Sequence, residues 1–176
     1  MSIFFTSDLH FSHQNILKYC SDSRKYSDIH EMNDSIIDTW NKTVSKNDSI
    51  YLLGDIGFGK PKATVELLNR LNGKNFYLVV GNHDAKLLRD TEFCEFFTWM
   101  KVYNEEKIIG ENFVMMHYPI ASWHRKNYGS IMLHGHCHGS PTKVSGRIKD
   151  VGWDTRQDLY NIEEIIEEMR NIPFLS

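Results

Sequence analysis

The sequence predicts one domain of the α/β class, and three observations lead to this prediction. Short apolar runs alternate with segments whose apolar residues have helical spacing, which is typical of sheets covered by helices. The 176 residues are 41% hydrophobic and 24% charged, which is enough to form one core. No repeat, low-complexity tract or linker interrupts the chain, so we expect a single domain over residues 1–176.

The first half is expected to alternate three strands with two helices. The strands are the apolar runs 2–7 (SIFFTS), 49–55 (SIYLLGD) and 75–84 (NFYLVVGNHD). Residues 61–73 begin with proline and end with glycine, as a helix often does. The other helix, 29–44, has its apolar residues at the spacing of one helical face: Ile29, Met32, Ile36, Trp40 and Val44.

The second half is expected to contain a hairpin, two strands and a closing helix. Residues 107–117 (KIIGENFVMMH) form the hairpin, with its turn across Gly110–Asn112. The two strands are 130–138 (SIMLHGHCH) and 143–152 (KVSGRIKDVG), and the helix is 161–170 (NIEEIIEEMR).

Polar side chains stand at the ends of five of the apolar runs. They are Asp8 and His10, then Asp55, then Asn82, His83 and Asp84, then His117, and finally His136 and His138. In sheets with alternating helices the carboxyl ends of the strands form the ligand crevice, so we expect these side chains to meet at one rim. His134 precedes the last pair, and in a regular strand all three alternate histidines would face the same way.

The chemistry of this set predicts a metal centre. Imidazole nitrogens and carboxylate oxygens together suit Zn, Mn, Fe, Co or Ni better than Ca or Mg. The set is too large for one ion, because about four to six ligands saturate a single transition metal. Two ions that share a bridging carboxylate would use all of the side chains.

The same residues carry a resemblance to a known family. The segments DLH, GDIG, GNHD, MMH and GHCH, in this order, resemble the calcineurin-like metallophosphoesterase superfamily. The resemblance extends from Asp8 to the DVGWD run at 150–154, and the closest subgroup is that of small, uncapped bacterial and phage phosphoesterases. It implies a four-layer α-β-β-α sandwich of two mixed sheets with flanking helices, with the metal site at the carboxyl ends of the strands.

The resemblance also implies a role for each residue. Asp8, His10 and His138 would hold the first ion, Asn82, His117 and His136 the second, and Asp55 would bridge them. His83 would be the general acid, with Asp84 orienting its protonated form, whereas His134 would be structural. The expected cofactors are two divalent transition-metal ions, with Mn²⁺ preferred and Fe, Zn, Ni or Co as alternatives.

The second segment of this chain differs from that of one branch of the superfamily, and the difference concerns the substrate. The serine/threonine phosphatases of the superfamily carry GDxVDRG, with arginines that clamp a terminal phosphate, whereas this chain has GDIGFGK. We therefore expect phosphodiester hydrolysis, with phosphomonoester hydrolysis as the alternative. A non-catalytic scaffold, as in the retromer subunit of this fold, is disfavoured because every expected ligand is present. A small nucleic-acid-binding zinc module is disfavoured because its ligands would be scattered from Asp8 to His138.

Composition sets the expected partners and location. The net charge of −3 gives no basic stripe, so we expect a small phosphoester or nucleotide-like substrate and no extended nucleic acid. No apolar stretch approaches the roughly 20 residues that cross a bilayer, and the start shows no signal peptide, so we expect no membrane association. Cys20, Cys94 and Cys137 are odd in number and far apart, which favours reduced thiols in the cytoplasm.

Four residues remain open between two interpretations. His13 either faces the substrate or begins the helix HQNILKY. His124 and Arg125 form either a phosphate-binding rim or an exposed basic loop. Cys137 is either a packed residue or a soft metal ligand.

Overall fold

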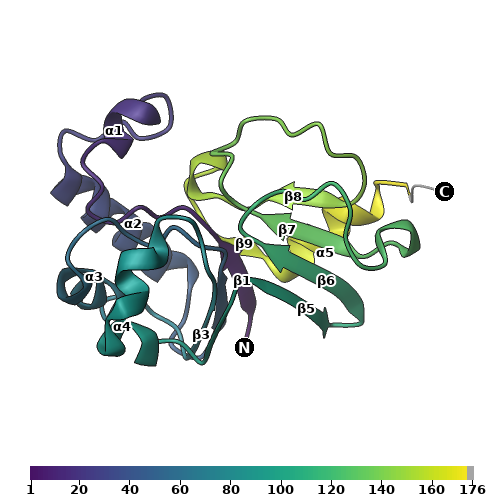
Figure 1. Ribbon diagram of the computed structural model, residues 1–176, viewed down its shortest axis with the longest axis horizontal. Coiled ribbons are helices and arrows are strands. Elements are labelled where there is room, and N and C mark those ends of the chain that lie inside the picture. Colours follow the sequence, from purple (N-terminus) through teal and green to yellow (C-terminus); the bar gives the residue numbers. More distant parts are fainter. Residues whose placement is uncertain (174–176) are drawn as a thin grey trace.

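Two mixed β-sheets pack face to face in the computed structural model, which describes residues 1–173 (Figure 1). The first sheet has the order β4-β3-β2-β1-β9, in which only β9 is antiparallel to its neighbour. Its strands are β1 (Ile3–Thr6), β2 (Ser49–Leu52), β3 (Asn75–Val79), β4 (Trp99–Lys101) and β9 (Tyr160–Asn161). The second sheet, β5-β6-β7-β8, consists of β5 (Tyr103–Ile108), β6 (Glu111–Met116), β7 (Ile131–His134) and β8 (Ile148–Asp150).

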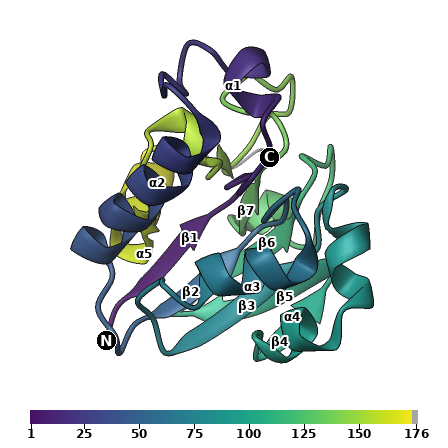
Figure 2. The same cartoon turned by 90° about the vertical axis from the view of Figure 1, so that its left-hand side faces the viewer.

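Helices flank this pair of sheets, which confirms the expected fold class. The α-helices are α1 (Ile16–Tyr19), α2 (Ile29–Thr43), α3 (Pro61–Leu68), α4 (Thr91–Glu95) and α5 (Ile162–Arg170). Short 3₁₀ helices occur at η1 (Asp84–Arg89), η2 (Lys126–Tyr128) and η3 (Trp153–Thr155). Seen from the helical side in Figure 2, α2 and α3 lie over the strands of the first sheet. Among the described residues, no helix has the length and apolar character needed to cross a membrane.

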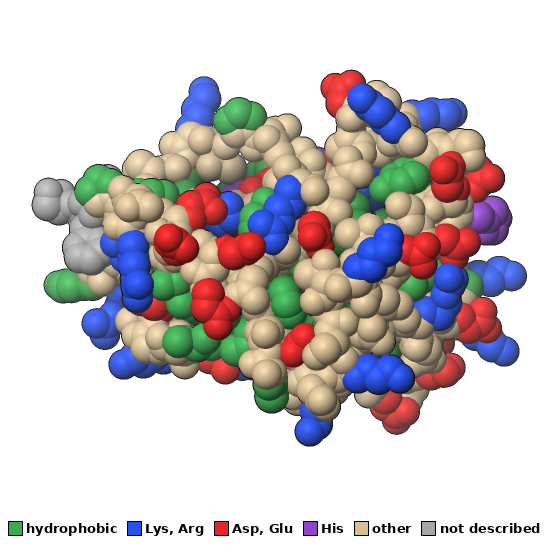
Figure 3. All heavy atoms as spheres, turned by 180° about the vertical axis from the view of Figure 1, so that it is seen from behind, with side chains coloured by type: hydrophobic (Ala, Val, Ile, Leu, Met, Phe, Trp, Pro, Cys, Tyr) green, Lys and Arg blue, Asp and Glu red, His purple; other side chains and the backbone are tan. Residues whose placement is uncertain are grey.

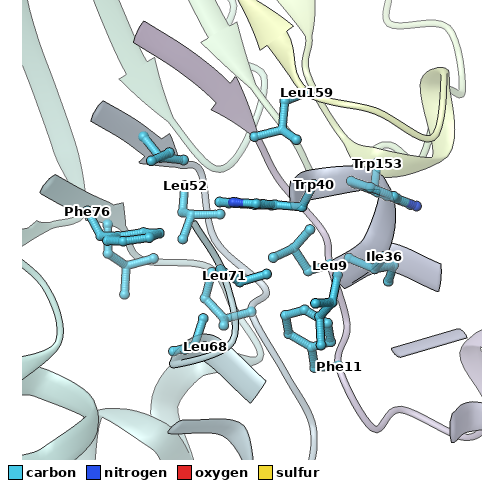
Figure 4. Packing of buried hydrophobic residues seen from close by; sticks show 14 of the residues in the cluster. Leu9, Phe11, Ile36, Trp40, Leu52, Leu68, Leu71, Phe76, Trp153 and Leu159 are labelled. Atoms are coloured by element: carbon cyan, nitrogen blue, oxygen red, sulfur yellow. The ribbon is translucent and has the colours of Figure 1, made fainter. Parts of the chain in front are cut away.

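The outer core lies between the first sheet and its helices. Because side chains alternate along a strand, Phe4, Ile50 and Leu52 face the helices while their neighbours face the second sheet. Trp40 of α2 is fully buried in this core, as Figure 4 shows, and its indole nitrogen donates to the Asn72 carbonyl at 2.8 Å. The helix is thus held to the sheet by both apolar burial and one specific hydrogen bond.

The inner core lies between the two sheets. Phe5 of β1 stacks on Phe113 of β6 with ring centroids 5.7 Å apart, and Leu133 of β7 joins the same cluster. Helix α5 contributes its apolar face to this cluster: Ile162, Ile165, Ile166 and Met169. The outer face of the second sheet is covered mainly by Trp123 and loop residues, since η2 is the helical segment there. The two sheets are thereby held face to face, with their loops at one rim.

Some expected elements have different limits in the structure. The strand expected over 130–138 ends at His134, because Gly135 begins a turn in which His136 and His138 have positive φ. The strand expected over 143–152 is limited to β8. The hairpin forms as expected, but its turn falls on Ile109 and Gly110, with φ of 48° and 84°. Helix α4 and strand β4 were not expected, since each has only a few residues.

Candidate metal centre

The predicted site residues lie in loops that leave β1, β2, β3, β6 and β7 at one rim. Backbone hydrogen bonds join these loops: the amide of Asp8 donates to Gly54, that of His10 to Asp55, and that of Gly135 to His117, each at 3.0 Å. These hydrogen bonds fix the loops relative to one another.

Five of the predicted ligands adopt a left-handed backbone conformation. The φ angles are 57° at Asp8, 52° at His10, 56° at Asp55, 68° at His136 and 48° at His138. This conformation is uncommon for residues with a side chain and persists where the surrounding structure enforces it, often at functional sites. Each loop turns sharply after its strand and directs a ligand side chain into the rim.

A first group is formed by Asp8, His10 and His138. Its candidate ligand atoms lie within 4.8 Å of one another. Nε2 of His10 is 3.9 Å and Nε2 of His138 is 3.8 Å from Oδ1 of Asp8. Asp8 Oδ1 and His10 Nε2 are both buried without a hydrogen-bond partner among the described residues. Buried polar atoms without partners are costly, and a cation between them would satisfy both.

A second group is formed by Asn82, His117 and His136. Oδ1 of Asn82 lies 2.9 Å from Nε2 of His117 and 3.0 Å from Nδ1 of His136. Nδ1 of His117 is 2.7 Å from the Leu53 carbonyl, to which it donates its proton. Nε2 of His117 then faces the Asn82 oxygen, and a contact this short needs a proton on Nε2 or a cation between the two atoms.

Asp55 lies between the two groups. Its Oδ2 is 3.7 Å from Nε2 of His10 and 3.5 Å from Nε2 of His117. Its Oδ1 accepts the backbone amide of His83 at 2.9 Å, which fixes the carboxylate. Asp8 and Asp55 also form a candidate ligand set with His117, so both carboxylates adjoin the second group.

Burial sets the charge of two members of the first group, Asp8 and His10. It raises the pKa of the Asp8 carboxyl to about 6 and lowers the pKa of His10 to about 2. His10 is therefore neutral at pH 7, which is the form that ligates a metal. Burial also raises the pKa of Asp55, but hydrogen bonding and charge from His117 outweigh it and lower that pKa to about 2.

A buried network braces His138. Its Nδ1 is 2.7 Å from Oδ2 of Asp154, and the Arg24 guanidinium donates to both Asp154 oxygens at 2.8 Å. Arg24 is buried and also donates to the carbonyls of Asp8 and Leu9. Burial raises the pKa of Asp154, but these hydrogen bonds hold it well below its usual range. With Nδ1 committed to Asp154, Nε2 of His138 faces Asp8.

Comparison with known proteins assigns this chain to a family. The model of the calcineurin-like phosphoesterases matches residues 1–168. The chain belongs to this family. It is 38% identical over 140 residues to an uncharacterized protein of Methanocaldococcus jannaschii, covering 78% of this chain and 70% of that one. It is also 27% identical over 200 residues to the Gene 66 protein of a Mycobacterium phage, covering 97% of each.

A solved structure agrees with the fold. The crystal structure of a protein of unknown function from Aquifex aeolicus superposes with a TM-score of 0.75, covering 95% of this chain and 98% of the other. The two sequences are 19% identical, so this similarity concerns the fold. Membership of the calcineurin-like phosphoesterases makes the chain a phosphoesterase, and divalent metal ions are implied by the family together with the Asp and His groups of the rim.

Asp84 does not have the role expected from the sequence. Its buried carboxylate accepts three backbone amides, those of Gly81 at 2.8 Å, Ile56 at 2.9 Å and Asp55 at 3.0 Å. The expected pairing of Asp84 with the His83 ring is therefore wrong, because both carboxylate oxygens are engaged by the backbone. In this calcineurin-like phosphoesterase, Asp84 instead holds the Asp55 loop against the loop after β3.

Glycines make the close approach of the ligands possible. A Cβ on Gly81 would overlap Oδ1 of Asp55, and one on Gly135 would overlap Ser7 and Oδ2 of Asp8. The glycines of GNHD and GHCH therefore leave room for the two carboxylates. The sequence shows these glycines, but the side chains that pack against them are known only from the structure.

The remaining candidates occupy other environments. His134 is buried and its Nδ1 is 2.8 Å from the Gly135 carbonyl, so it belongs to neither ligand group. His13 precedes α1 and is buried, with Nδ1 3.3 Å from Nδ1 of His10. His124 is paired with Glu105 at 2.7 Å in a hollow of about 220 Å³ that it shares with Arg125 and with none of the ligands. Arg24 and Asp154 were not anticipated, although DVGWD contains Asp154.

Proposed function

We propose that this chain hydrolyses a phosphodiester at a dinuclear centre that holds two divalent transition-metal ions, Mn²⁺ being the first choice. The observation that carries the proposal is the position of Asp55. Its Oδ2 lies 3.7 Å from His10 in the first group and 3.5 Å from His117 in the second. A carboxylate that lies between two sets of ligands is suited to bridging two ions.

Each group would hold one ion. Asp8, His10 and His138 would bind the first, Asn82, His117 and His136 the second, and Asp55 would contact both. Bound divalent ions at such a centre activate water as a nucleophile and polarise the phosphoryl group. The two carboxylates, Asp8 and Asp55, leave a net positive charge at the loaded site, which favours an anionic phosphoester.

His83 is suited to protonate the leaving oxygen. Its side chain is 40% exposed at the rim, and its Nε2 lies 3.9 Å from Oδ2 of Asp55. The backbone of His83 is fixed by its hydrogen bond to Asp55, so the ring stays at the rim beside that carboxylate. A proton held at Nε2 can pass to the departing alkoxide, which is general acid catalysis.

The preference for a diester is supported by the state of Arg24. The guanidinium is bonded to Asp154 and to two backbone carbonyls, so it is not available to clamp the second charge of a monoester. The face of the molecule in Figure 3 has Lys and Arg interspersed with Asp and Glu, which supports a small substrate over extended nucleic acid. A cytoplasmic location is supported by the free thiols of Cys20, Cys94 and Cys137.

The test is hydrolysis of a chromogenic phosphodiester and of the matching monoester. The purified protein is treated with chelator, and Mn²⁺ is then added back to part of the sample. We expect diester turnover only after Mn²⁺ is added, with slower monoester turnover. Failure to hydrolyse either ester while Mn²⁺ is bound would contradict the proposal. Faster turnover of the monoester than of the diester would show that the enzyme is a phosphomonoesterase.

A further inference from the structure

We propose that Phe58 and Tyr19, together with the buried ring of His13, form a subsite for a planar aromatic group of the substrate, a nucleobase. This inference rests on the proposed function, because it assigns the leaving-group side of the same centre. It identifies the substrate as a nucleotide-type phosphodiester. Three features support this subsite: the stacking of Phe58 on His13, the fixed backbone of Phe58, and the groove that connects it to the metal centre.

Phe58 stacks on a side chain that itself contacts the metal centre. The rings of Phe58 and His13 have centroids 4.1 Å apart and an interplanar angle of 14°. His13 is buried, and its Nδ1 is 3.3 Å from Nδ1 of His10. The Phe58 ring is therefore held at a fixed place beside the first ligand group.

The exposure of Phe58 is not caused by a loose backbone. Its amide donates to the Phe11 carbonyl at 2.8 Å, and the preceding Gly57 forms a bridge with Phe11. Half of the side-chain surface nevertheless remains exposed, at 50%. Since one ring face is covered by His13, a second planar ring can stack on the exposed part.

A groove of about 500 Å³ connects Phe58 to the candidate metal centre. Its lining includes Phe58, Tyr19, His13, His10, His83 and His138. This volume is within the range of small-molecule sites, about 300–1,000 Å³. Tyr19, at the end of α1, is 74% exposed, and its ring centroid is 6.3 Å from that of His13. The groove thus has an aromatic wall at one part and metal ligands at another.

The position of His83 assigns this groove to the leaving group. Its ring is edge-on to Phe58 with centroids 5.2 Å apart. If His83 protonates the leaving oxygen, the group attached to that oxygen must begin beside His83 and therefore beside Phe58. Stacking on an aromatic side chain is the general way in which proteins bind single nucleobases, and it accepts every base.

The test is a comparison of two ligands that differ by the base. Binding of adenosine 5′-monophosphate and of ribose 5-phosphate to the Mn²⁺-loaded protein is measured by calorimetry, with both ligands verified as intact afterwards. We expect the nucleotide to bind at least about fivefold more tightly, the lower end of what one stacked base contributes. Phe58→Ala should reduce this affinity ratio to about one and leave ribose 5-phosphate binding unchanged. Phe58→Trp should keep the wild-type ratio.

The matched control is Tyr128→Ala, since Tyr128 is an aromatic residue of η2 with 78% exposure. This variant should retain the wild-type ratio. Equal binding of the two ligands by the wild type, or an unchanged ratio in Phe58→Ala, would overturn the subsite. Diester hydrolysis without a base preference would leave the proposed function in place and remove the subsite. Tighter binding of the nucleotide without any hydrolysis would support the subsite and contradict the proposed function.

Discussion

The two ligand groups of the candidate metal centre differ in how they are held. In the first group, Asp8 and His10 are buried, and two of their polar atoms have no partner among the described residues. In the second group, Asn82 and His136 are exposed, and the ligand atoms bond to one another at 2.9 and 3.0 Å. The first group therefore contains unpaired polar atoms, whereas the ligand atoms of the second contact one another.

The cause of this difference is the support behind each group. His138 is fixed by Asp154, which is fixed in turn by Arg24 and Ser23. A ring held in this way keeps its Nε2 directed at the site without any ligand. The second group has one comparable support, the contact of His117 with the Leu53 carbonyl. The comparison indicates that one half of the centre is preorganised and the other adapts.

The strongest test removes the residue that the two groups share. Asp55→Asn keeps the size of the side chain but would weaken its bond to each of the two proposed ions. We expect phosphodiester hydrolysis to fall by about a thousandfold or more, since both proposed ions would support the reaction. Metal content and circular dichroism are measured together with activity. A folded, metal-replete and fully active Asp55→Asn protein would contradict the bridging role.

His83 belongs to neither group, so its replacement separates proton transfer from metal binding. His83→Ala should lower hydrolysis of alkyl diesters by about a hundredfold, a typical share for general acid catalysis. Hydrolysis of nitrophenyl esters should change little, because their leaving group needs no proton. Metal content should stay at the wild-type value. Equal losses on both ester types would show that His83 acts in another way.

The network behind the first group can be tested through Asp154. Asp154→Asn should weaken metal binding to the first group by about tenfold to a hundredfold, because His138 loses its orienting carboxylate. The measurement is a Mn²⁺ titration at a temperature where the variant is folded. Asp150→Asn is the matched control: Asp150 holds the same loops through the amides of Gly139 and Gly152 but does not bond to His138. Equal losses of Mn²⁺ affinity in both variants would show that the effect comes from disturbed loops and not from the orientation of His138.

Much of this site was predictable because its residues follow apolar runs. Strand ends are visible in one sequence as the change from apolar to polar residues, so Asp8, Asp55 and His117 were expected at one rim. The two mixed sheets and the family, implied by the five segments that contain these residues, are confirmed. The ligand assignments remain predictions, although the structure brings the assigned residues together.

The features that were missed depend on backbone conformation or on distant partners. Periodicity predicted that His134, His136 and His138 share a strand face, but left-handed turns after His134 place the last two in a loop. The bonds of Arg24 to Asp154 join residues 130 positions apart, and a single sequence contains no signal for such pairs. Asp84 was misassigned for the same reason, because its partners include the distant amides of Asp55 and Ile56.

The comparison of the two groups finally predicts an order of metal binding. An ion that enters the first group meets unpaired atoms, whereas an ion that enters the second must separate the short contacts of Asn82 Oδ1 with His117 and His136. We therefore expect two steps in a Mn²⁺ titration, separated by about tenfold or more in affinity. His138→Ala should remove the tighter step, and His136→Ala should remove the weaker one. If His136→Ala instead removed the tighter step, the first ion would bind at the second group, and the support behind His138 would not determine the order of binding.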